Sequence, residues 1–210
     1  MSHQYKQYLT TTLSYSIIKD YFSQLFLRDS NQILIYAEGN VGSANNLGLS
    51  MATQLTPFKW WSLSAQGLFN YKKLNGYVWN NYSSDISQFN VSMNNQFKIG
   101  KVYTAELSGF YTGRARNDLQ ELLYPNSQVL IGLARPVLKK KGTLKLSMRD
   151  IFHTLGMEGV TDFQLASEYF LLRRDSRVIN VSFVYRFGKP LKAVKRSTGG
   201  AADEMQRAGS

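Results

Sequence analysis

Eight segments of this chain alternate between apolar and polar residues, and this alternation limits its possible folds more than any other feature. Successive side chains of a strand point to opposite faces of a sheet, so each segment predicts a β-strand with one apolar face. The predicted strands lie near residues 9–17, 47–55, 61–71, 88–97, 103–112, 129–133, 143–149 and 178–187. We therefore expect an all-β protein.

The polar faces of these segments favour a membrane barrel over a soluble sheet. A soluble sheet usually turns Lys, Glu and Arg to bulk water, whereas these faces consist mostly of Ser, Thr, Asn, Gln and Gly. The apolar faces end in aromatic residues, as in the aromatic girdles at the two membrane interfaces of outer-membrane barrels. We assign Trp61, Tyr103, Tyr185 and Phe187 to such interfaces. The alternative is a soluble, carbohydrate-binding β-sandwich with an aromatic core.

The connections between the predicted strands alternate between short and long. Short links follow the second, fourth and sixth strands, and long ones follow the first, third, fifth and seventh. Outer-membrane barrels have short periplasmic turns and longer extracellular loops. The sequence thus predicts part of an antiparallel up-and-down transmembrane β-barrel of about eight strands. Within the loops, residues 21–27 and 32–38 are expected to form a hairpin, and residues 162–173 to extend the last hairpin outward.

Composition excludes several other classes. No apolar run is long enough for a transmembrane helix, and the absence of cysteine excludes disulfides and thiolate metal sites. The net charge of +11 could indicate nucleic acid, but the chain contains no nucleic-acid-binding motif, so we expect no such partner. The N-terminus lacks a signal peptide, so we expect a piece of a longer exported protein.

The chain carries no motif of a known catalytic site, and we expect neither enzymatic activity nor a cofactor or metal. Glu106 is the one carboxylate on the polar face of a central strand, where it should pair with a Lys or Arg of a neighbouring strand; a substrate or ion site is the other interpretation. Arg114 and Arg116 are candidates for an anionic ligand or lipopolysaccharide, or else form a solvated rim with the arginines of residues 173–177. Trp79 is a candidate for sugar stacking.

Several stretches together resemble one family. The ending "RVINVSFVYRFGKP", followed by "KRSTGGAADEMQR", is similar to the C-terminus of Bacteroidetes outer-membrane β-barrel proteins related to TonB-dependent (SusC-like) receptors. The stretches "YLTTTLSYS", "NVGSANNLGLSM" and "KWWSLSAQG" resemble barrel strands of this family. "MRDIFHT" resembles an Asp-Ile-Phe-Asn-Thr element, with His153 in place of Asn. The resemblance spans residues 5–208.

The resemblance implies an outer-membrane protein for nutrient binding and uptake. Such a receptor has a barrel of about 22 strands and an N-terminal plug. Residues 1–188 are therefore expected to be the C-terminal part of a larger barrel, and residues 189–210 a flexible basic periplasmic tail. Expected partners are outer-membrane lipid, the barrel assembly machinery, an unidentified small or oligomeric substrate, and the rest of the barrel with its plug. The alternative is a self-contained eight-stranded barrel with a structural or adhesive role, whose first and eighth strands pair near Ser14 and Ser182.

Overall fold

A computed structural model of the chain describes residues 1–6, 8–28, 31, 33–77, 81–116, 120–163 and 166–187. These residues form thirteen β-strands, all paired antiparallel, and one 3-10 helix, Leu138–Lys140. None of the described helical segments is long and apolar enough to cross a membrane. The predicted all-β fold is confirmed, but the expected number of about eight strands is too low.

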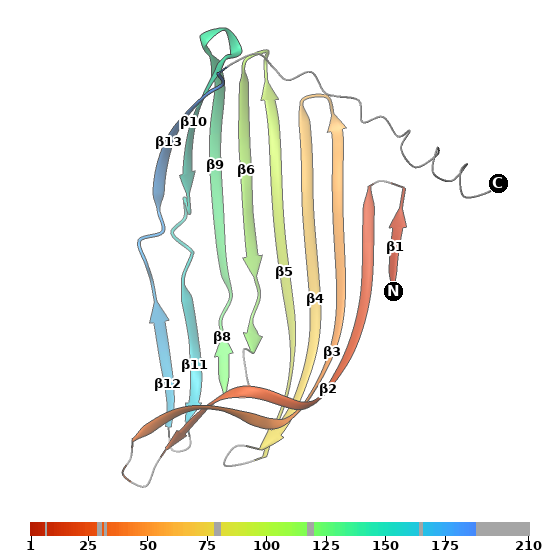
Figure 1. Ribbon diagram of the computed structural model, residues 1–210, viewed down its shortest axis with the longest axis vertical. Helices are drawn as coiled ribbons and strands as arrows, with labels where there is room; N and C mark the ends of the chain where they lie inside the picture. The colour runs from red at the N-terminus through yellow and green to blue at the C-terminus, as the bar shows by residue number, and fades with distance from the viewer. Residues whose placement is uncertain are drawn as a thin grey trace, which may run out of the picture.

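Nine strands form one open sheet whose order follows the chain (Figure 1). They are β1 (Ser2–Tyr5), β2 (Leu9–Arg28), β3 (Leu34–Phe58), β4 (Trp61–Tyr77), β5 (Asn81–Ile99), β6 (Tyr103–Thr112), β9 (Asn126–Val137), β10 (Gly142–Arg149) and β13 (Val178–Tyr185). The eight predicted strands all lie in this sheet, as β2 to β6, β9, β10 and β13. In the described part of the chain β13 pairs only with β10, so the sheet does not close. The self-contained eight-stranded barrel is therefore not observed.

The additional strands come mainly from the long loops. A second sheet has the order β12 (Ala166–Leu172), β11 (Met157–Phe163), β8 (Glu121–Leu123) and β7 (Ala115–Arg116). Residues 162–173, expected to extend the last hairpin, instead contain the end of β11 and the whole of β12, which pair with each other. Strand β1 was not predicted because its sequence, "SHQY", has no apolar alternation.

The two ends of the main sheet differ as predicted. At one end the strands are joined by Lys59–Trp60, by Gly100–Val102, and by the 3-10 helix with Lys141. The second sheet and the long excursions all lie at the other end (Figure 1). Short turns therefore lie at one end as predicted, but the predicted long loop at residues 72–85 is mostly strand, and only residues 78–80 separate β4 from β5.

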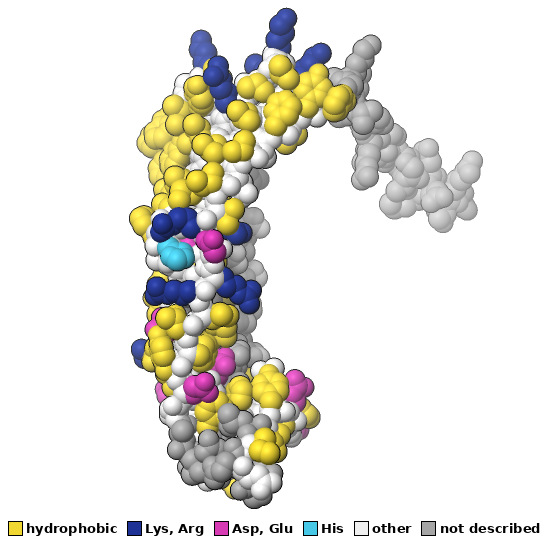
Figure 2. Space-filling view, turned by 90° about the vertical axis from the view of Figure 1, so that its left-hand side faces the viewer, with side chains coloured by type: hydrophobic (Ala, Val, Ile, Leu, Met, Phe, Trp, Pro, Cys, Tyr) yellow, Lys and Arg dark blue, Asp and Glu magenta, His cyan; other side chains and the backbone are white. Residues whose placement is uncertain are grey.

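Strand register gathers the apolar side chains on one face of the main sheet. Directly opposed residues share a face, and two rows of such partners are Leu13, Leu49, Phe69 and Phe89, and Leu107, Ile131, Met148 and Ile179. Figure 2 shows this apolar face as the convex side of the curved sheet. No second sheet of the described chain covers it, and most of these side chains are exposed. The structure therefore does not support a soluble sandwich with an aromatic core.

Candidate functional site on the concave face

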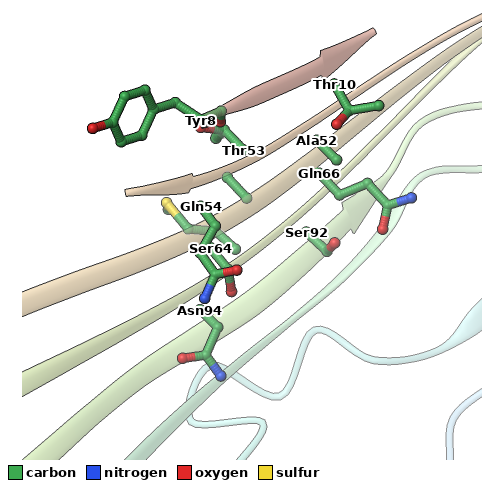
Figure 3. Close-up of a pocket in the computed structure, with 11 residues that line it drawn as sticks. Tyr8, Thr10, Ala52, Thr53, Gln54, Ser64, Gln66, Ser92 and Asn94 are labelled. Atoms are coloured by element: carbon green, nitrogen blue, oxygen red, sulfur yellow. Dashed lines mark hydrogen bonds between the residues drawn. The ribbon is translucent and has the colours of Figure 1, made fainter. Parts of the chain in front are cut away.

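The concave face of the sheet carries a polar groove near the short-turn end. Two neighbouring rows of cross-strand partners form its floor: Thr10, Ala52, Gln66 and Ser92, and Gln54, Ser64 and Asn94 (Figure 3). The groove has a volume of about 450 Å³, and none of the described residues that line it is charged. Hydroxyl and amide groups both donate and accept hydrogen bonds, so the groove suits a neutral polar solute.

Glu106 lies farther along the same face and is paired, as expected. Lys145 Nζ lies 2.7 Å from Glu106 Oε2, and Asn94 Nδ2 donates to Glu106 Oε1 at 3.4 Å. Lys145 belongs to β10, two strands away, not to a neighbouring strand as predicted. The intervening strand β9 carries Gly132 there, where a Cβ would lie 3.5 Å from Lys145 Cε and 3.6 Å from Glu106 Oε2. These are ordinary contact distances for a Cβ, so the ion pair crosses β9 directly over Gly132, with little space left above the strand.

Strands β2 and β3 continue beyond the sheet as the expected hairpin, which bends over the concave face. The register shifts at the bend, where Asp20 and Gly42 have positive φ values of 58° and 148°. A Cβ on Gly42 would lie 2.1 Å from the carbonyl oxygen of Asn75, so only glycine allows β3 to pass so close to β4. Beyond the bend, Tyr21 and Leu25 pack against the buried Leu74.

Gln120 fastens the far end of this hairpin to the second sheet. Its side chain is 2% exposed; Oε1 accepts from Phe26 N at 2.9 Å, and Nε2 donates to Phe26 O at 2.9 Å and to Asp162 O at 3.0 Å. The rings of Phe26 and Phe163 meet edge to face at 5.5 Å. The hairpin therefore spans the concave face at the long-loop end, from β2 and β3 to β11 (Figure 1). Gln120 could not be identified from the sequence, because its partner Phe26 is 94 residues away.

The predicted interface aromatic Trp61 covers a polar residue on the convex face. Asn95 opposes Leu63 and Leu107, so it shares the apolar face, but it is 6% exposed. Trp61 Nε1 donates to Asn95 Oδ1 at 3.0 Å, and the Trp61 ring stacks on Phe97 at 6.1 Å. Asn95 was missed in the sequence, although it is a polar residue at an apolar position of the alternation.

The other predicted interface aromatics lie at the short-turn end. Tyr103 begins β6 and lies under the Arg135 guanidinium, 5.3 Å from its ring centroid. Tyr185 ends β13 and meets Phe187 edge to face at 4.6 Å. Their positions fit one aromatic girdle, and their contact with lipid stays a prediction.

The structure places the loop candidates apart from the concave groove. Arg114 is exposed, with its guanidinium 5.5 Å from the ring centroid of Tyr124, and Arg116 lies in β7, opposite Leu122 of β8. Both residues belong to the region of the second sheet and not to the surroundings of Glu106. Trp79 lies outside the described residues, as do residues 189–210 of the predicted tail. A role of Arg114 and Arg116 in anion binding stays a prediction.

A buried carboxylate organises the turn after β10. Asp150 is fully buried and accepts hydrogen bonds from Thr154 N at 2.9 Å, from Leu155 N at 3.1 Å and from the Ser176 hydroxyl. Burial alone would raise its pKa, but the hydrogen bonds outweigh burial and hold the pKa below its ordinary value. Asp150 therefore ties this turn to the segment that precedes β13. From the sequence, Asp150 was noted only as part of the stretch "MRDIFHT", which resembles an element of the family.

These features define the class of the protein. A curved antiparallel sheet with an exposed apolar convex face, an uncharged polar concave face and short turns at one end is the wall of an outer-membrane-type barrel. The model of the outer membrane protein β-barrel family matches residues 1–185, and the chain belongs to this family. Outer-membrane location and contact with outer-membrane lipid follow from this membership. No curated protein and no solved structure matches the chain.

Proposed function

We propose that this chain forms part of the wall of an outer-membrane transport barrel that binds and takes up polar nutrients. The observation that carries the proposal is the concave groove of about 450 Å³ with its uncharged hydroxyl and amide lining. A second hollow of about 190 Å³ continues it towards Gln96. Hydroxyl and amide groups form hydrogen bonds with a sugar or peptide that passes through the groove. Because the described residues of the groove carry no charge, it does not bind an ion of either sign tightly. The proposed role is transport without catalysis.

The edges of the sheet support a larger barrel. On the convex face, Ile179 and Val181 of β13 are 65% and 70% exposed, whereas Leu107 and Ile131 of inner strands are 41% and 43% exposed. The difference arises because β13 has a neighbour on one side only among the described strands. An unpaired strand edge is costly in lipid, since its backbone groups find no water. We propose that further strands of a larger barrel occupy these edges.

The resemblance to TonB-dependent receptors extends the proposal to energy-coupled uptake through a barrel with a plug. That part rests on the C-terminal stretch "VYRFGKP" and the internal stretches that resemble the family, and not on the geometry of the groove.

Uptake by cells tests the proposed transport. Cells with and without the protein would be given labelled oligosaccharides and peptides, and we expect loss of the protein to lower accumulation of one of these classes. A Ser64→Trp variant, which fills the groove, should lower the same uptake at an unchanged level in the outer membrane. Leu107→Trp on the convex face is the matched control and should transport normally. Equal uptake by cells with and without the protein, or by the Ser64→Trp variant, would contradict the proposal.

A further inference from the structure

A pocket on the convex face lies where the apolar belt ends. Its volume is about 270 Å³, and its lining includes Tyr111, Asn126, His153, Thr154, Glu158 and Arg173. Tyr111 lies near the end of β6 that is distant from the short turns, where the second aromatic girdle belongs. Figure 2 shows Lys and Arg side chains and a histidine gathered in a band between two apolar zones on this side. The pocket therefore lies at the depth of lipid headgroups.

The length of β13 supports this depth. From Phe187, beside the short turns, to Arg177, the first charged residue beyond Ile179 on this face, the chain runs about ten residues. At about 3.3 Å per residue and a tilt of about 40°, this corresponds to a height of about 25 Å. An outer-membrane barrel has an apolar band of about that height. The segment 173–177 thus begins where the hydrocarbon ends.

The pocket presents a cation and a carboxylate that do not satisfy one another. Arg173 and Glu158 both line it, yet no ion pair joins them among the described residues. Glu158 Oε1 accepts from the Tyr169 hydroxyl at 2.8 Å, which leaves the other carboxylate oxygen for a further donor. Asn126 Nδ2 donates to Gly156 O at 3.3 Å, but Asn126 Oδ1 is buried and has no hydrogen-bond partner in the described part of the chain. Because this oxygen is closed off from solvent, it is not available to a ligand in the pocket.

We propose that this pocket binds the zwitterionic phosphoethanolamine headgroup of a membrane lipid. The planar guanidinium of Arg173 matches a phosphate. The ammonium group donates to the Glu158 carboxylate oxygen that Tyr169 leaves free. A purely anionic headgroup would instead place its phosphate beside the Glu158 carboxylate, with no ammonium group to offset that charge. Glu158 therefore selects the amine, and Arg173 selects the phosphate. This site is independent of the proposed transport.

Lipid retention tests the proposal. The full chain would be folded into vesicles of equal parts phosphatidylethanolamine, phosphatidylglycerol and phosphatidylcholine, extracted in mild detergent, and analysed for bound lipid by mass spectrometry. We expect enrichment of phosphatidylethanolamine over both other lipids. Arg173→Gln and Glu158→Gln should each lower this enrichment about tenfold, since each removes one charge-assisted hydrogen bond. Lys101→Gln at the short-turn end is the control and should leave it unchanged.

Competition separates a lipid site from a free-phosphate site. Soluble phosphoethanolamine should displace the retained lipid, whereas inorganic phosphate at the same concentration should not. Equal displacement by phosphate would overturn the proposal, as would equal retention of phosphatidylglycerol or unchanged enrichment in the Glu158→Gln variant. If either variant does not fold, the lipid preference of the unmodified chain and its competition profile still decide the matter.

Discussion

Asp150 shows how one buried residue can set the stability of a turn. Its pKa is lowered in the folded protein, so its contribution is present above the unfolded pKa of about 3.9 and is lost as the pH falls through the lower folded value. We expect the Thr154 and Leu155 amides to be protected from hydrogen exchange at pH 5 and 7 and to lose protection below about pH 3.9.

An Asp150→Ala variant should lose this protection at every pH, at a cost of about 1–3 kcal/mol, because the buried donors of the turn are left unpaired. Asp175→Asn, which changes an exposed carboxylate of the neighbouring segment, is the control. Unchanged protection of Leu155 in the Asp150→Ala variant would show that the turn is held by other contacts.

The ion pair between Glu106 and Lys145 is expected to contribute modestly. The two side chains are 21% and 42% exposed, so water screens their attraction. In a double-mutant cycle of Glu106→Gln and Lys145→Met, measured by urea unfolding in vesicles, we expect a coupling of about 0.5–1 kcal/mol. Strictly additive effects would mean that the contact across Gly132 does not stabilise the sheet.

Among the structural elements, the hairpin of β2 and β3 depends on one glutamine. Gln120→Leu removes the hydrogen bonds to both backbone groups of Phe26, and we expect about 1–3 kcal/mol of local stability to be lost. Hydrogen exchange at the Phe26 amide and limited proteolysis of the hairpin should both accelerate, while the main sheet stays protected. Gln24→Leu, an exposed change on the same hairpin, should have neither effect. Unchanged exchange at Phe26 would mean that the packing of the Phe26 and Phe163 rings alone holds the hairpin against the second sheet.

The two faces of a single strand should respond oppositely to a charge. Leu107 faces the convex side, and Leu107→Arg at mid-membrane should cost about 2–4 kcal/mol in unfolding from vesicles. The adjacent Ser108 faces the concave side, so Ser108→Arg should cost far less because its charge stays in water. Similar losses for both variants would contradict the assignment of the faces.

The strands of the main sheet were predictable because period-2 alternation is a local signal that eight of them carry. Of the second sheet only the segment 162–173 was anticipated, and as an extension of the last hairpin, since β7 and β8 have only two and three residues and show no period. Asn95 and Gln120 escaped prediction for a related reason. Each is a buried polar residue satisfied by partners distant in the chain, and alternation contains no information on such partners.

For the whole molecule, closure is the property that alternation does not determine. Alternation specifies which face of each strand meets lipid, and the turns specify which strands are neighbours. The curvature of the sheet and the pairing of its two edges depend on the number and stagger of all the strands. The Glu106 pairing could be anticipated from a single strand, whereas the open edge at β13 was expected only from the resemblance to larger barrels.

The open sheet can be tested by cross-linking, because the chain has no cysteine of its own. Ser14 and Ser182 lie on β2 and β13, near opposite edges of the sheet, so a Ser14→Cys, Ser182→Cys variant in vesicles should form no disulfide within one chain. Ser147 and Asn180 are direct partners, and opposed Cα atoms of about 4.5–5.5 Å lie within disulfide range. Ser147→Cys, Asn180→Cys should therefore cross-link and serves as the positive control. Efficient cross-linking of positions 14 and 182 within one chain would show that these strands close a small barrel, and would remove the need for further strands at the edges.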